Sequence, residues 1–162
     1  MYIANDRSEL MLSLIDKSVN IRTMVDLGCN DGATLSGLSF NKSLGAIDYH
    51  GIDYQITPLV VNNDEITFHV CDLNGDLLEI KDLLKASDLT LLLDVLEHLH
   101  KPEQFLEKLS QIIKPGAQLI ITVPNASSIR MLYAWLKKDF PRNSIGYFDR
   151  THCSWFTTKS LS

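Results

Sequence analysis

The sequence has few cysteines, and their arrangement suggests neither a metal site nor a disulfide framework. Cys29, Cys71 and Cys153 lie far apart in the 162-residue chain. No Cys-x-x-Cys pair and no local cluster of cysteine with histidine occurs. Zinc sites and small folds held by disulfides both need closely spaced ligands or cysteines. We therefore expect no bound metal and no disulfide framework.

The sequence also lacks a basic block and a long apolar run. Fifteen lysines and arginines are outnumbered by 20 aspartates and glutamates, giving a formal net charge of -5. Duplex nucleic acids are bound by clustered positive charge. No apolar run approaches the ~20 residues that cross a bilayer, and no secretory signal pattern opens the chain. We expect a cytoplasmic protein without a nucleic-acid or membrane partner; the oligomeric state is not indicated.

Segments with strand character alternate with helical segments. Strands are predicted at 21–27, 49–53, 66–71, 89–94 and 118–123, and helices at 8–18, 31–40, 57–62, 77–86, 102–113 and 127–138. Short apolar runs such as 89–94 are typical of strands buried on both faces of a parallel sheet. The alternation predicts right-handed crossovers, and so an α/β fold with a Rossmann-like doubly wound parallel sheet and helices on both faces.

Apolar positions suggest which faces of the outer helices are buried. In the first predicted helix, Leu10, Leu12, Leu14 and Ile15 fall near one another, with polar residues between them. We expect the inner side of the last helix to carry Met131, Leu132, Trp135 and Leu136.

Residues 24–35 are the segment around which the chain is organised. An apolar strand is followed by a glycine-bearing turn and then by a possible helix start, which presents backbone N–H groups to a ligand. Gly28 permits the sharp turn, and Gly32 permits close packing of the helix on its strand. Residues 29–31 do not supply the middle glycine of a G-x-G-x-x-G loop. The acidic loop also disfavours a pyrophosphate, so we expect a nucleotide-like ligand without one.

An aspartate stands at or near the end of four predicted strands: Asp26, Asp53, Asp72 and Asp94. The carboxyl ends of parallel strands meet at one edge of a sheet, beside Gly28. Carboxylates gathered there would attract a cationic ligand and repel a diphosphate. Asp53 could accept hydrogen bonds from both hydroxyls of a ribose. The simpler alternative is that these are solvated acids at strand ends.

Four motifs in this order resemble those of class I S-adenosylmethionine-dependent methyltransferases that act on small molecules and sugars. They lie at residues 25–32, 51–54, 71–73 and 93–124. The resemblance implies a sheet in the order 3-2-1-4-5-7-6, for which this sequence provides about five of the seven strands. Because the chain also ends in what looks like a helix start at 157–162, we expect residues 1–162 to be one S-adenosylmethionine-binding domain whose C-terminal part is missing.

The resemblance implies S-adenosylmethionine as cofactor and S-adenosylhomocysteine as product. The residues it assigns to the cofactor are Asp26, Gly28, Cys29, Asn30, Gly32, Asp53, Tyr54, Asp72, Leu73, Asp94 and Val95. By this resemblance Tyr54 covers the adenine, Asp72 accepts from its amino group, and Asp94 and Val95 lie beside the sulfonium. Asn30 replaces a glycine of the family, which its tolerance of left-handed backbone permits.

The expected reaction is direct in-line transfer of the methyl group to an oxygen or nitrogen of a small-molecule acceptor. Such a reaction needs no covalent enzyme intermediate, which agrees with the absence of a nucleophile, base and acid in a recognisable pattern. His98 and His152 are the candidates for a catalytic base, although either could simply pack or cap. The alternatives are a non-catalytic domain that binds the cofactor or a partner and, less favoured by the loop, a nicotinamide-dependent oxidoreductase.

Overall fold

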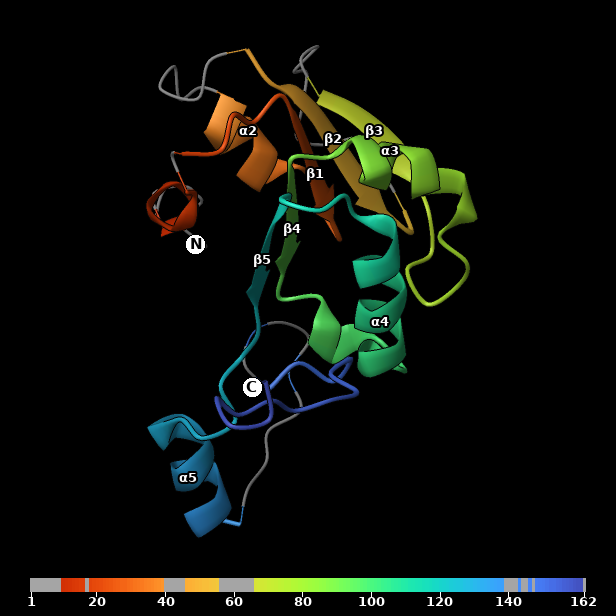
Figure 1. Ribbon diagram of the computed structural model, residues 1–162. Coiled ribbons are helices and arrows are strands. Elements are labelled where there is room, and N and C mark those ends of the chain that lie inside the picture. Colours follow the sequence, from red (N-terminus) through yellow and green to blue (C-terminus); the bar gives the residue numbers. More distant parts are fainter. Residues whose placement is uncertain are drawn as a thin grey trace.

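Five parallel strands form the centre of the molecule in a computed structural model, which describes residues 10–16, 18–39, 46–55, 66–138, 143, 146 and 148–161 (Figure 1). The strands are β1 (Thr23–Leu27), β2 (Asp48–Asp53), β3 (Ile66–Val70), β4 (Leu89–Leu93) and β5 (Gln118–Thr122). Their order is β3-β2-β1-β4-β5, and every pairing is parallel. This confirms the predicted fold class.

Helices connect the strands at most of the predicted places. They are α2 (Ala33–Ser39), η2 (Leu78–Ile80), α3 (Lys81–Ala86), η3 (Leu96–His98), α4 (Pro102–Ile112) and α5 (Ile129–Leu136), and residues 10–14 are also helical. The helix predicted at 77–86 is thus a 3-10 turn followed by a short α-helix. The helix predicted at 57–62 lies outside the described residues. None of the described helices is long and apolar enough to cross a membrane.

Side chains from successive strand residues pack on opposite faces of the sheet, as the pleat requires. Leu89, Leu91 and Leu93 of β4 belong to one cluster of buried side chains, and Leu92 belongs to the other. The first cluster includes residues of the N-terminal helical segment and of α2, whereas the second includes residues of α3 and α4. These helices lie on the two sides of the sheet in Figure 1, which confirms helices on both faces.

In two helices the buried and exposed positions differ from the predicted apolar grouping. In the N-terminal helical segment Met11 is buried at 1% exposure, whereas Leu10 and Leu14 are about half exposed. Met11 and Ile15 are four residues apart and therefore share the face that meets the sheet. In α5, which extends away from the sheet in Figure 1, Leu132 and Leu136 are 53% and 65% exposed. Periodicity finds an apolar face, but it does not show whether another element covers that face.

A chain of polar contacts joins the edge strand β3 to its neighbour β2. Asp48 Oδ2 lies 3.0 Å from His50 Nε2, and His50 Nδ1 lies 3.0 Å from His69 Nε2. A carboxylate only accepts hydrogen bonds, so His50 donates from Nε2 and accepts at Nδ1, and His69 donates from Nε2. Burial lowers the pKa of His69, and the neighbouring His50 lowers it further. Protonating His69 is therefore less favourable in the folded protein than in the unfolded chain.

We predict that the free energy of unfolding falls as the pH is lowered below about 6.5, the ordinary pKa of histidine. The sign follows because the unfolded chain, in which the pKa of His69 is not lowered, binds more protons in this window. His69→Gln keeps an N–H donor and should flatten the dependence. Urea unfolding at several pH values measures it, with the exposed His100→Gln as matched control. An unchanged pH dependence in His69→Gln would contradict the prediction.

Candidate functional site

The turn after β1 is fixed to the end of β2 by backbone hydrogen bonds. The N–H groups of Gly28 and Cys29 both donate to the carbonyl of Ile52, at 2.7 and 3.0 Å. Gly28, Asn30 and Gly32 have φ angles of 79, 50 and 73°. Asn30 thus adopts left-handed backbone, as expected for an asparagine in place of a glycine. Residues 28–32 form what we call the glycine loop.

Gly28 also sits in close contact with the segment that follows β4. A Cβ atom added at Gly28 would lie 2.5 Å from Val95 Cγ2. Val95 is itself buried, at 7% exposure. The close approach and the positive φ therefore each require glycine at this position. They bring Val95, one of the predicted cofactor residues, directly against the glycine loop.

Asp53, the last residue of β2, points its carboxylate at the glycine loop. Its Oδ2 accepts a hydrogen bond from the Asn30 N–H at 2.8 Å, and the residue is 8% exposed. A carboxylate offers about four acceptor positions, so this bond leaves capacity for further donors. Asp26, one residue before the end of β1, is 2% exposed. The structure thus brings Asp26 and Asp53 to the two adjacent strand ends that bear the loop.

Asp94 follows β4 in an uncommon backbone conformation. Its φ angle is 56°, which costs a non-glycine residue conformational energy. The Asp94 N–H donates to the Thr122 carbonyl at 3.0 Å, and the Thr122 hydroxyl donates to Asp94 Oδ1 at 3.0 Å. Sequence reasoning missed Thr122, because nothing in the sequence aligns the end of β5 with that of β4.

The remaining predicted residues lie at the ends of β2 and β3. Asp72 is exposed, and its Oδ1 accepts the Asn74 N–H at 2.9 Å, so this carboxylate also stabilises its own turn. Leu73 is buried at 8% exposure. Tyr54, which follows Asp53, is 73% exposed. A large aromatic side chain that is this exposed is available to cover a flat ligand.

Cys29 is a packing residue of the glycine loop. It is 6% exposed, and its Sγ would lie 2.8 Å from a Cβ atom added at Gly51. Burial raises the pKa of this thiol far above its ordinary value, and the carboxylates of Asp26 and Asp53 raise it further. A thiol that stays protonated is a poor nucleophile.

The two predicted catalytic histidines meet beside a buried carboxylate. The rings of His98 and His152 are 4.8 Å apart in an edge-to-face arrangement, and His152 Nε2 lies 4.0 Å from Glu97 Oε1. Glu97 is 1% exposed. Its carbonyl accepts the N–H groups of Cys153 and Ser154 at 2.6 and 3.1 Å. Residues 148–156, which we call the tail segment, are therefore docked on η3. We call Glu97, His98 and His152 the histidine cluster.

A hydrogen-bond chain orients the ring of His98. The Thr151 hydroxyl donates to Asp149 Oδ1 at 2.7 Å and lies 2.9 Å from His98 Nδ1. Because the hydroxyl hydrogen is directed to Asp149, the hydroxyl accepts from His98 Nδ1–H. The Nε2 atom of His98 then carries the lone pair. Hydrogen bonds from Thr151 lower the pKa of Asp149, which keeps this acceptor ionised.

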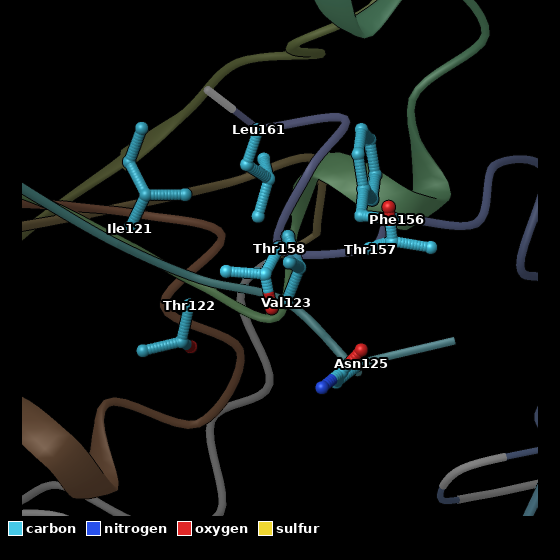
Figure 2. A pocket seen from close by; sticks show the side chains of 8 residues that line it. All are labelled: Ile121, Thr122, Val123, Asn125, Phe156, Thr157, Thr158 and Leu161. Atoms are coloured by element: carbon cyan, nitrogen blue, oxygen red, sulfur yellow. The ribbon is translucent and has the colours of Figure 1, made fainter. Parts of the chain in front are cut away.

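A pocket of about 290 Å³ lies between the end of β5 and the C-terminal residues (Figure 2). It is lined by Ile121, Thr122, Val123, Asn125, Phe156, Thr157, Thr158 and Leu161. The N–H of Ala126 donates to the Phe156 carbonyl at 2.7 Å and so fixes one wall to the other. Thr122, which holds the Asp94 carboxylate, is part of this wall. The pocket is therefore adjacent to one of the predicted cofactor residues.

A family model and a curated relative both match the chain. A family model described as a methyltransferase domain matches residues 5–162. The mitochondrial ubiquinone biosynthesis O-methyltransferase of Dictyostelium discoideum is 28% identical, and the match covers 43% of this chain and 27% of that protein.

Two solved structures show the same fold. An S-adenosylmethionine-dependent methyltransferase from Archaeoglobus fulgidus has a TM-score of 0.64 and 19% identity, covering 98% of this chain and 64% of that one. The plantazolicin methyltransferase BpumL was solved with a substrate analogue and S-adenosylhomocysteine. It has a TM-score of 0.63 and 19% identity, and the match covers 98% of this chain and 58% of that one. The chain spans less than two thirds of the length of these relatives.

We predict that Gly28→Ala destabilises the fold more than Gly116→Ala does. Both glycines have positive φ, at 79 and 85°, but a Cβ atom at Gly116 would meet nothing within 4 Å. Each change should cost about 1–2 kcal/mol for the backbone conformation. Gly28→Ala should cost roughly 1–3 kcal/mol more through the clash with Val95. Urea unfolding of the two variants measures the difference.

A double-mutant cycle separates the clash from the backbone cost. In a Val95→Ala background the two Cγ methyl groups closest to the new Cβ are removed. Gly28→Ala should then cost about as much as Gly116→Ala. Equal costs of Gly28→Ala in both backgrounds would show that contact with Val95 does not constrain Gly28.

Proposed function

Because the chain belongs to the methyltransferase-domain family, we propose that it binds S-adenosylmethionine beside the glycine loop and transfers its methyl group to a small-molecule acceptor. The observation that carries the proposal is the Asp53 carboxylate, which the Asn30 N–H holds against the loop at 2.8 Å. Asp26, buried at the end of the adjacent strand, adds a second negative charge. The S-adenosylhomocysteine in the BpumL structure supports the choice of cofactor.

We assign the parts of the cofactor to these residues as follows. The ribose hydroxyls donate to Asp53, and the adenine lies between Tyr54 and the turn at Asp72 and Leu73. The methionine part lies along the backbone of residues 28–32, with its ammonium toward Asp26. The sulfonium lies beside Asp94 and Val95. This arrangement matches a cationic ligand to a carboxylate-lined site, which a nicotinamide dinucleotide with its diphosphate would not do.

The acceptor oxygen or nitrogen attacks the methyl carbon in line with the departing sulfur. Holding the two reactants in this geometry can lower the barrier by roughly 7–11 kcal/mol. The pocket beside Thr122 and Phe156 is the proposed place for the acceptor. Where the acceptor must lose a proton, the histidine cluster is the group that acts on it, with His98 and His152 facing one another over Glu97. Such assistance contributes typically about 10²–10⁴-fold.

A second candidate function is a non-catalytic domain that binds S-adenosylmethionine or its product. The chain spans 27% of the Dictyostelium relative and 64% of the Archaeoglobus structure, so parts that those proteins have are not matched by this sequence. Calorimetric titration with S-adenosylmethionine, S-adenosylhomocysteine and NADH is the first test. Transfer of an isotope-labelled methyl group to a panel of phenols, sugars, carboxylic acids and amines is the second.

The outcomes distinguish the candidates. Binding of both sulfur ligands with transfer to one acceptor class supports the enzyme. Binding without transfer to any class supports the binding domain. Binding of NADH alone would overturn both.

We predict that Asp53→Asn weakens the binding of S-adenosylhomocysteine by about 10- to 100-fold, the cost of replacing charged hydrogen bonds with neutral ones. Asparagine keeps an oxygen that can accept the Asn30 N–H, so the loop should stay in place. Isothermal titration measures the affinity. Asp82→Asn is the matched control, because its side chain on α3 is 98% exposed. Equal affinities of the two variants would exclude Asp53 from the site.

A further inference from the structure

We infer that the histidine cluster is a binding site for one divalent transition-metal ion of the Zn²⁺ class. The candidate ligand atoms of Glu97, His98 and His152 all lie within 4.8 Å of one another. They come from η3 and from the tail segment, which are distant in sequence. The expectation of no metal rests on local spacing in the sequence, whereas this set is assembled only by the docking of the tail segment on η3.

The donor set is the one that this class of ion prefers. Two imidazole nitrogens and one carboxylate oxygen bind Zn²⁺ at about 2.0–2.2 Å and leave a fourth position open. In a tetrahedral site such atoms are about 3.3 Å apart, so binding would require the three side chains to move closer together than the 4.8 Å within which they lie. Hard ions such as Mg²⁺ favour oxygen ligands and fit this set less well.

The surroundings of His98 provide what a metal-binding histidine needs. Ligating imidazoles donate their second N–H to an oxygen, which fixes the tautomer. His98 Nδ1 lies 2.9 Å from the Thr151 hydroxyl, which itself donates to Asp149. The lone pair of His98 is therefore on Nε2, the other ring nitrogen. This orientation is set before any ion binds.

Burial strengthens the electrostatic attraction at the site. The side chains of Glu97 and His152 are 2% and 4% exposed, so bulk water screens a charge on the Glu97 carboxylate poorly. His98 is only partly buried, which leaves an approach for an ion and for a fourth ligand. The carbonyl of Glu97 also binds the tail segment through Cys153 and Ser154. An ion bound by side chains of both segments would form a second link between η3 and the tail segment.

A bound ion would also select the class of acceptor, a consequence that rests on the proposed function. A hydroxyl in the open position would lose its proton to solvent more readily, because the ion lowers its pKa. The oxygen lone pair would form the new O–CH₃ bond, and the S–CH₃ bonding pair would remain on sulfur. The acceptor would then be an alcohol or a phenol.

The test is a titration of metal-stripped protein with Zn²⁺ by calorimetry and with Co²⁺ by visible absorption. It is run in a Cys153→Ser background, since Cys153 is an exposed thiol beside the site. We expect about one ion per chain and the intense absorption of a four-coordinate Co²⁺ site. His98→Gln and His152→Gln should each weaken binding tenfold or more, and Thr151→Val about 10–100-fold.

His100→Gln is the matched control, because His100 is exposed and lies two residues after His98 in the sequence, and this variant should bind metal unchanged. Thermal unfolding checks that each variant is folded. If His152→Gln fails to fold, metal binding by His98→Gln decides the result, because His98 is only partly buried. No binding of Zn²⁺ or Co²⁺, or binding that His98→Gln leaves unchanged, overturns the inference. Binding of S-adenosylhomocysteine is measured separately, so that its loss counts against the proposed function and not against the metal site.

Discussion

The hydrogen bonds between the glycine loop and the end of β2 are the constraint on which the candidate site depends. The carbonyl of Ile52 accepts the N–H groups of Gly28 and Cys29, and the carboxylate of Asp53 accepts that of Asn30. These bonds provide acceptors for backbone N–H groups that would otherwise be unpaired where β1 ends. They also fix Asp53 relative to the loop. One set of bonds therefore forms the turn and positions the carboxylate proposed to bind the ribose.

The register of the parallel strands brings the other residues of the site together. Because β1 pairs with both β2 and β4, the residues that follow these strands meet at one edge. Val95 reaches Gly28 for this reason, and Thr122 reaches Asp94 because β5 pairs with β4. The tail segment then docks on η3 through Glu97 and brings His152 to His98. Each step adds a residue that is remote in sequence.

The sequence predicts what depends on local pattern and order. The alternation of strands and helices predicts the sheet, and the glycines and Asn30 predict the turn, since both follow from backbone preferences of single residues. The contacts of Thr122 and the burial of Glu97 could not be predicted, because they depend on packing between separate segments. The same limit explains the wrong face assigned to Leu132 in α5.

Asp94 shows how a departure from local preference can mark a site. Its backbone has a φ of 56°, which glycine adopts without cost and which other residues adopt at roughly 1–2 kcal/mol. A purely structural turn would therefore be served better by glycine. The chain instead has a carboxylate here, and the Thr122 hydroxyl fixes one of its oxygens at 3.0 Å. A negative charge fixed at this point agrees with the proposal that Asp94 lies beside the sulfonium of the cofactor.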